Sequence, residues 1–171
     1  MAMLDEADRE PEADAPLDML ESYFAAHGWA CERHDDEICA TVKGSWTEYE
    51  LRALFREEDS VLQFLAFPDV KVAEERRAAI HETLALVNEQ LWVGHFELWS
   101  SSGILLYRNA TLVDARDDEA TLSLSAAELL VESAIDECER FYPVFQFVLW
   151  GGKTPREAIA AAMVGAFHDR R

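Results

Sequence analysis

The 171-residue chain carries 34 Asp and Glu against 15 Lys and Arg, a net charge of −19, and half of its residues are hydrophobic. Proteins that bind nucleic acids or anionic membranes use clustered Lys and Arg, so this charge argues against both kinds of partner. The hydrophobic content is sufficient for one packed domain.

Residues 1–15 are acidic, contain several Ala and Pro, and have few large apolar side chains. We expect them to form a disordered tail, followed by a single domain over residues 16–167. No secretory signal is visible, and no segment is apolar over the ~20 residues that a membrane span needs. Three cysteines without a CxxC pair are typical of a reduced protein, so we expect a cytoplasmic location.

A helix is predicted over residues 16–27, because apolar side chains recur there at spacings of three and four and Gly28 can end it. Strands are expected next at residues 29–33, 38–43, 48–56 and 61–67. The third of them alternates most clearly, with Tyr49, Leu51 and Ala53 on one face. Such alternation indicates one buried and one wet face, as in an antiparallel sheet.

The first two strands are expected to form a hairpin. A three-residue turn at residues 34–36 would place Arg33 opposite Glu37 and Cys31 opposite Cys39. Cross-strand neighbours at such positions lie within disulfide reach. In a reducing compartment, however, we expect both cysteines to remain thiols.

A second helix is predicted over residues 72–91, followed by strands at 96–99 and 104–113. A third helix is expected to begin at Ser125, which with Glu128 forms a capping box, flanked by Leu124 and Leu129 as a hydrophobic staple. Pro143 is expected to end or kink that helix.

A further apolar segment then reaches Trp150, and Gly151 and Gly152 break it. The last helix is expected to open at a capping box formed by Thr154 and Glu157. Helices thus lie between groups of strands and do not follow each strand. This order predicts an α+β fold, in which helices pack on an antiparallel sheet.

No catalytic, cofactor or metal site is predicted. Gly152-Lys153-Thr154 resembles the end of a phosphate loop, but Phe147 stands where that motif requires Gly, and two helices flank the segment. None of the five histidines lies three or four residues from another histidine, a spacing at which helices hold metal ions.

The carboxylates of Glu128, Glu132 and Asp136 recur every four residues along one predicted helix face. Such a row can bind a divalent ion or serve acid–base chemistry. A solvated acidic face, with Asp136 paired to Arg140, is the simpler interpretation.

Aromatic residues are dense in the second half of the chain. Residues 141–150 are apolar nearly all round the predicted helix, so several of its sides must be covered, by a core or by a second copy. As a partner or dimer interface we predict Trp92, Phe96, Trp99, Phe141, Phe145 and Trp150.

Two stretches carry a family resemblance. Residues 88–99 (Asn-Glu-Gln-Leu-Trp-Val-Gly-His-Phe-Glu-Leu-Trp) and residues 134–146 resemble the alphaproteobacterial branch of the YbjN family, as do residues 75–77. The resemblance covers about residues 17–164. It implies a bacterial sensory transduction regulator with a fold similar to type III secretion chaperones, which are acidic homodimers that hold other polypeptides. The extra C-terminal helices go beyond that pattern, and the family supplies no catalytic residues to transfer.

We therefore expect a non-enzymatic binding module, regulatory or chaperone-like, that acts as a cytoplasmic homodimer on a protein partner. The acidity suits solubility and also leaves basic proteins as partners. The alternative is a small-molecule sensor or an unrecognised enzyme, with a pocket between sheet and helices. Its conceivable polar contributors are Arg52, Gln63, His95 and Tyr107.

Overall fold

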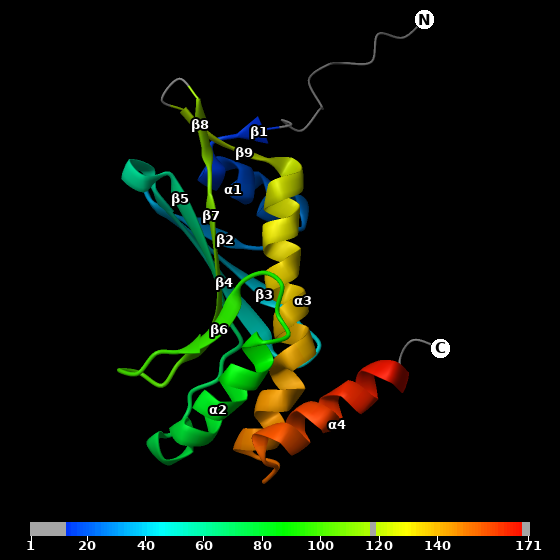
Figure 1. Cartoon of the computed structure of the whole chain (residues 1–171). Coiled ribbons are helices and arrows are strands. Elements are labelled where there is room, and N and C mark those ends of the chain that lie inside the picture. Colours follow the sequence, from blue (N-terminus) through cyan, green and yellow to red (C-terminus); the bar gives the residue numbers. More distant parts are fainter. Residues whose placement is uncertain (1–12, 117–118, 169–171) are drawn as a thin grey trace, which may run out of the picture.

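The computed structural model of the chain describes residues 13–116 and 119–168. In this part of the chain, helices pack on one face of an antiparallel sheet (Figure 1), which confirms the predicted α+β class. The helices are α1 (Pro16–Ala26), α2 (Arg77–Asn88), α3 (Leu124–Leu149) and α4 (Pro155–His168), with 3-10 turns at Glu57–Asp59 and Glu74–Arg76. Helix α3 crosses the sheet, and α4 packs against α2 and α3.

The main sheet has the strand order β2-β3-β4-β5-β7-β6, with every neighbouring pair antiparallel. Its strands are β2 (Cys31–Arg33), β3 (Glu37–Lys43), β4 (Glu48–Arg56), β5 (Val61–Phe67), β6 (His95–Leu98) and β7 (Leu105–Leu112). The alternation predicted for β4 is confirmed, because Tyr49, Leu51 and Ala53 are buried between the sheet and the helices. Burial of this face supplies most of the driving force for packing the helices on it.

A second, small sheet was not predicted. It has the order β1-β9-β8 and consists of β1 (Ala13–Asp14), β9 (Glu119–Ser123) and β8 (Asp114–Arg116). Residues 1–12 of the predicted tail lie outside the described residues, but Ala13 and Asp14, which that prediction included, form β1. Strands of two to five residues contain too few alternations to be recognised by periodicity.

The predicted hairpin register is wrong by one residue. His34 N donates to Glu37 O at 2.8 Å, so the turn has two residues and Cys31 lies opposite Ala40. Because side chains alternate along a strand, this shift moves one cysteine to each face: Cys31 packs against the core, while Cys39 lies next to Glu37 on the other face. All three cysteines are free.

The N-terminus of α3 also differs from the prediction. Ser123 is the N-cap, and its Oγ accepts a hydrogen bond from Ala126 N at 3.1 Å, so the box predicted at Ser125 and Glu128 is two residues too late. The preceding strand β9 positions Ser123 here. In the last helix, the predicted capping box is confirmed by reciprocal hydrogen bonds between Thr154 and Glu157 at 3.1 and 3.3 Å.

The helix does not end at Pro143, since α3 continues to Leu149. Proline has no N–H, which leaves the carbonyl of Glu139 without its usual helical donor. Trp46 Nε1, in the turn between β3 and β4, donates to that carbonyl at 3.1 Å, and its ring stacks on Tyr142. Ser45 N also donates to Glu139 Oε1 at 2.8 Å. A tertiary contact thus replaces the bond that proline removes.

Replacing Trp46 with Phe is expected to lower the free energy of unfolding by about 1–2 kcal/mol, because a carbonyl loses its donor while the aromatic packing is retained. In a Pro143→Ala background the residue 143 N–H can supply the bond, so the same change should cost clearly less. Urea unfolding of the wild type, both single variants and the double variant measures this coupling. Equal costs in the two backgrounds would contradict it.

Candidate functional site

The six aromatic residues predicted as an interface are divided between the core and the surface. Phe96 lies at the centre of the core, with its ring centroid 5.4 Å from Tyr107, 5.9 Å from Phe141 and 5.3 Å from Phe145. Phe96, Phe141 and Phe145 are each no more than 2% exposed. For these three residues the interface prediction is wrong, because the chain's own helices and sheet enclose them.

The three tryptophans of that prediction are more accessible. Trp92, in the loop between α2 and β6, is 99% exposed, and Trp150, at the C-terminus of α3, is 64% exposed. Trp99 is half-buried on the outer face of the sheet, where its Nε1 donates to Glu97. Trp92 and Trp150 therefore remain available to a partner.

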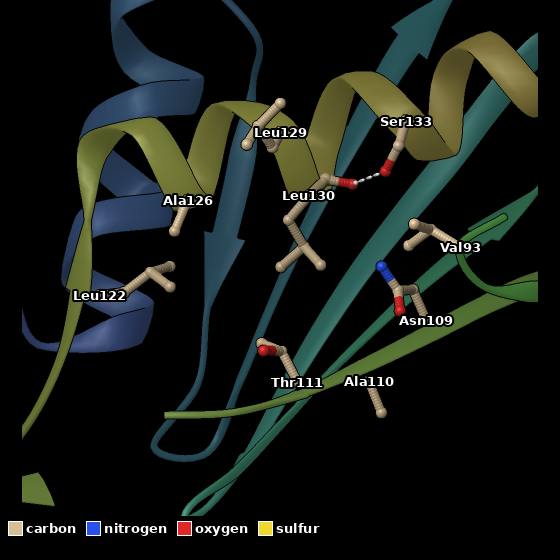
Figure 2. A pocket seen from close by; sticks show the side chains of 9 residues that line it. All are labelled: Val93, Asn109, Ala110, Thr111, Leu122, Ala126, Leu129, Leu130 and Ser133. Carbon is tan, nitrogen blue, oxygen red and sulfur yellow. Dashed lines mark hydrogen bonds between the residues drawn. The ribbon is translucent and has the colours of Figure 1, made fainter. Parts of the chain in front are cut away.

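A groove of about 410 Å³ lies between strand β7 and the N-terminal half of α3. Helix α3 forms one wall with Ala126, Leu129, Leu130 and Ser133, and Val93 closes one end (Figure 2). The other lining residues are Asn109, Ala110, Thr111 and Leu122. The lining is mainly apolar, and none of these side chains titrates near neutral pH.

Exposed apolar side chains concentrate around this groove. The large hydrophobic residues that are exposed in the described residues are Trp46, Trp92, Val93, Leu112, Leu129 and Trp150. Val93 and Leu129 line the groove, and Trp92 precedes Val93. Leu112 lies on the same face of β7 as Ala110, which points away from α3. A cluster of this kind on a protein surface typically marks a binding site. We call Trp92, Val93 and Leu129 the groove rim.

The groove exists because β6 is too short to cover β7. Pairing between the two strands runs from Leu98–Leu105 to His95–Arg108 and ends there. Gly94 precedes β6 with φ +69°, a left-handed conformation at the point where the pairing with β7 ends. Beyond Arg108, β7 continues to Leu112 with β5 on only one side.

The groove was not predicted from the sequence, although β7 contains a signal for it. Leu105 and Tyr107 are buried on the helix-facing side of β7, and Asn109 and Thr111 continue the same side. Figure 2 shows both polar side chains pointing toward α3, whereas Ala110 points away. Two polar residues on a face that is otherwise core indicate that the helix cover ends there.

The residues proposed for a small-molecule pocket do not converge. Gln63 and His95 belong to a polar network on the outer face, in which Arg108 Nη1 donates to Gln63 at 3.3 Å and His95 lies 3.0 Å from Glu97. Tyr107 lies on the opposite face and donates to Val93 O at 2.8 Å. Arg52 bonds Glu50 at 2.7 Å instead. That part of the alternative is therefore wrong.

Glu97 is the centre of the outer-face network. Burial raises the pKa of its carboxyl, but hydrogen bonds from His95, Trp99 and Arg108 lower it by more, so the net pKa is below the usual range. Arg108 approaches Glu97 to 2.6 Å. An ion pair that is internally satisfied in this way stabilises the sheet and leaves no unpaired base for chemistry.

The cysteines and the carboxylates of α3 also lack the features of reactive groups. Burial and the neighbouring Glu37 raise the pKa of Cys39 to about 11, and burial raises the pKa of Cys138, so both remain thiols at neutral pH. Glu128, Glu132 and Asp136 are exposed on α3. The predicted ion pair between Asp136 and Arg140 is replaced by one between Glu137 and Arg140 at 3.6 Å. Among the described residues no group of three metal-ligating side chains gathers, and no helix is both long and apolar enough to cross a membrane.

Comparison with known proteins gives one family and two similar folds. The model of the YbjN family, described as "Putative bacterial sensory transduction regulator", matches residues 16–147, so α4 lies beyond the match. The crystal structure of YbjN, "a putative transcription regulator from E. coli", has a TM-score of 0.50 at 10% identity and covers 72% of this chain and 85% of its own. This likeness indicates a shared fold.

The ExsC–ExsE complex contains a chain that is similar at a TM-score of 0.45 and 18% identity, covering 72% of this chain and 88% of that one. No curated protein sequence matches the chain.

Proposed function

The chain belongs to the YbjN family, and from this premise we propose that it is a non-enzymatic regulatory module that binds a segment of another protein in the groove between β7 and α3. A chaperone-like role, in which the module holds its partner, is part of this proposal. The placement within an alphaproteobacterial branch stays a prediction from the sequence.

The observation that carries the proposal is the groove rim. Trp92 is 99% exposed, Leu129 is 70% exposed and Val93 is 52% exposed. Exposing large apolar side chains to water is unfavourable by about 25 cal/mol per Å² of apolar surface, and a partner that covers them recovers this free energy. Aromatic and aliphatic residues around a concave site are typical anchors for a protein partner.

The lining of the groove supports binding over catalysis. Its polar side chains belong to Asn109, Thr111 and Ser133, and none of them is placed beside a base that could activate it. Ser133 Oγ instead donates to Leu130 O at 3.2 Å within its own helix. Because the groove volume also lies in the range of small-molecule sites, a small apolar ligand is the alternative occupant. A thermal-shift screen that finds such a ligand and no protein partner would favour that alternative.

We also propose that the module is a cytoplasmic homodimer. The support is Trp150, a large apolar side chain that is 64% exposed at the end of α3 and lies away from the groove. A second copy covering this residue would leave the groove rim free for the partner. Light scattering should then give twice the chain mass of 19.4 kDa, and Trp150→Glu should return the protein to a monomer.

The groove is tested by co-purification from native lysate with paired variants. Leu129→Glu places a charge on the groove rim and should remove a specific partner, because desolvating an unpaired carboxylate costs several kcal/mol. Trp150→Glu is the matched control, which should keep the partner. Recovery of the same proteins by the wild type and Leu129→Glu would contradict the proposed function, provided both variants unfold at wild-type urea concentrations.

A further inference from the structure

Strand β7 has an open edge beside the groove. Val113 N donates to Ser60 O at 2.8 Å, so the backbone groups of odd-numbered residues in β7 point toward β5. The backbone groups of even-numbered residues point to the opposite side, toward β6. The carbonyl of Ile104, for example, accepts from Trp99 N at 2.9 Å. Ala110 and Leu112 are the even-numbered residues beyond β6, and within residues 13–116 and 119–168 no strand pairs with them on that side. Their N–H groups therefore face the solvent at the groove.

The outermost edge of the sheet is treated differently. On β6, the side chain of Asn88 accepts from Phe96 N at 2.8 Å and donates to Phe96 O at 3.0 Å, which occupies both backbone groups of that residue. The other outer strand, β2, is short and carries exposed Glu32 and Arg33. Blocked or charged edges prevent strand pairing with other chains. The edge at Ala110 and Leu112 has neither kind of protection.

The segments that border this edge, residues 109–112 and 119–137, contain no basic residue, although Glu128 and Glu132 of α3 lie on the side toward Tyr23 of α1. From residue 119 to residue 137, along β9 and the groove-forming half of α3, every charged residue is Asp or Glu: Glu119, Glu128, Glu132, Asp136 and Glu137. Residues 109–112 of β7 carry no charge, and the nearest basic group, Arg108, is paired with Glu97. A partner with basic side chains would be attracted to this end of the molecule.

We propose that the groove takes up an extended, basic segment of a partner protein, which adds to the main sheet as a strand along Ala110 and Leu112. This inference rests on the proposed function and specifies its mode of binding. The added strand lies in line with β6 and, like β6, runs antiparallel to β7. Because side chains alternate, two apolar residues at positions i and i+2 enter the groove against Leu129 and Leu130, and Lys or Arg on either side are attracted by the net charge of −19.

Charge favours such a segment over a second copy of this chain. Each copy carries a net charge of −19, so pairing two β7 edges would bring the two acidic stretches 119–137 together. Like charges at an interface disfavour the wrong partner. Strand addition also accounts for a groove that combines unpaired backbone N–H groups on one side with apolar side chains on the other, while the carbonyl of Leu112 accepts from Thr111 Oγ1 at 3.3 Å.

The first experiment uses three fluorescein-labelled peptides and the full-length protein. The probe is Lys-Lys-Val-Thr-Val-Thr-Lys-Lys, the second peptide carries N-methyl groups on both threonines, whose N–H groups face β7 when the valine side chains enter the groove, and the third has Glu in place of every Lys. Fluorescence anisotropy should detect binding of the first peptide at concentrations below about 1 mM. The other two are expected to bind at least about tenfold more weakly, since one lacks strand N–H groups and the other is repelled.

The second experiment locates the strand by amide hydrogen exchange. On adding the first peptide, the amides of Ala110 and Leu112 should gain at least about tenfold protection. Those of Asn109 and Thr111, which already face β5, should change little. The variant Ala110→Pro removes one edge N–H at a position where an edge strand tolerates proline, and it should weaken the first peptide by a similar factor.

The outcomes separate this inference from the function on which it rests. Equal binding of the N-methylated peptide, or no alternating gain in protection, overturns strand addition, while loss of the partner by Leu129→Glu would still support the groove. No binding of the first peptide at about 1 mM also overturns it. The amides of Ala110 and Leu112 could also be protected before any peptide is added. If dilution removes this protection, the edge is occupied by a second copy; if deleting residues 1–12 removes it, those residues occupy the edge. Either result overturns the proposal.

Discussion

Phe96→Ala is expected to lower the free energy of unfolding by about 3–5 kcal/mol. The ring of Phe96 is 2% exposed and contacts three other aromatic rings, those of Tyr107, Phe141 and Phe145. Its removal leaves a cavity where β6, β7 and α3 meet, and rigid neighbours of this kind fill such a cavity poorly. Urea or thermal unfolding measures the change.

Trp92→Ala provides the matched control within the same segment. Its side chain is 99% exposed, so the free energy of unfolding should change by less than about 0.5 kcal/mol. A loss from Trp92→Ala comparable to that from Phe96→Ala would contradict the assignment of one residue to the core and the other to the groove rim. Trp92→Ala should remain folded but bind the partner more weakly than Phe96→Ala does when that variant is folded.

Gly94→Ala is expected to lower the free energy of unfolding by about 3 kcal/mol or more. A Cβ at this position would lie 2.9 Å from the carbonyl oxygen of Arg108 and would collide with the Tyr107 hydroxyl. The φ of +69° adds the cost of a left-handed conformation for a residue with a side chain, about 1–2 kcal/mol. Since Tyr107 is buried and bonds Val93 O, neither neighbour can move freely.

Gly28→Ala separates the two contributions. Gly28 has a similar φ of +71°, but a Cβ there would have no atom within 4 Å. This control should lose only the conformational part, about 1–2 kcal/mol. The difference between the two variants in chemical denaturation therefore measures the close approach of the Gly94 loop to β7. Equal losses would mean that the loop does not pack against Tyr107 and Arg108 as described.

Several features were determined by local sequence. The alternation in β4 and the capping box of Thr154 and Glu157 were both predicted correctly, because each depends on residues only two or three positions apart. The α+β class followed from the order of helices and strands. Residues 88–99 and 134–146 carried the family resemblance, which the match over residues 16–147 confirms.

Tertiary structure decided the rest. The sequence does not distinguish Phe96 from Trp92, since both are aromatic residues near a strand start, and only the packing of α3 on β6 and β7 makes one core and the other surface. The path of α3 through Pro143 depends on Trp46, a residue 97 positions earlier in the sequence, whose indole N–H replaces the missing backbone donor. A one-residue difference in the turn at Asp35 and Asp36 moved Cys31 and Cys39 to opposite faces.

The groove shows most clearly where local sequence stops being informative. Its residues come from the α2–β6 loop, β7, β9 and α3, and no periodic pattern connects them. The chain alone determined that Asn109 and Thr111 are polar and Leu112 and Leu129 apolar. Whether those side chains are covered depends on β6 beginning only at His95 and on α3 crossing the sheet. Burial and edge exposure are properties of neighbours distant in sequence, and for that reason only the folded structure could reveal the site.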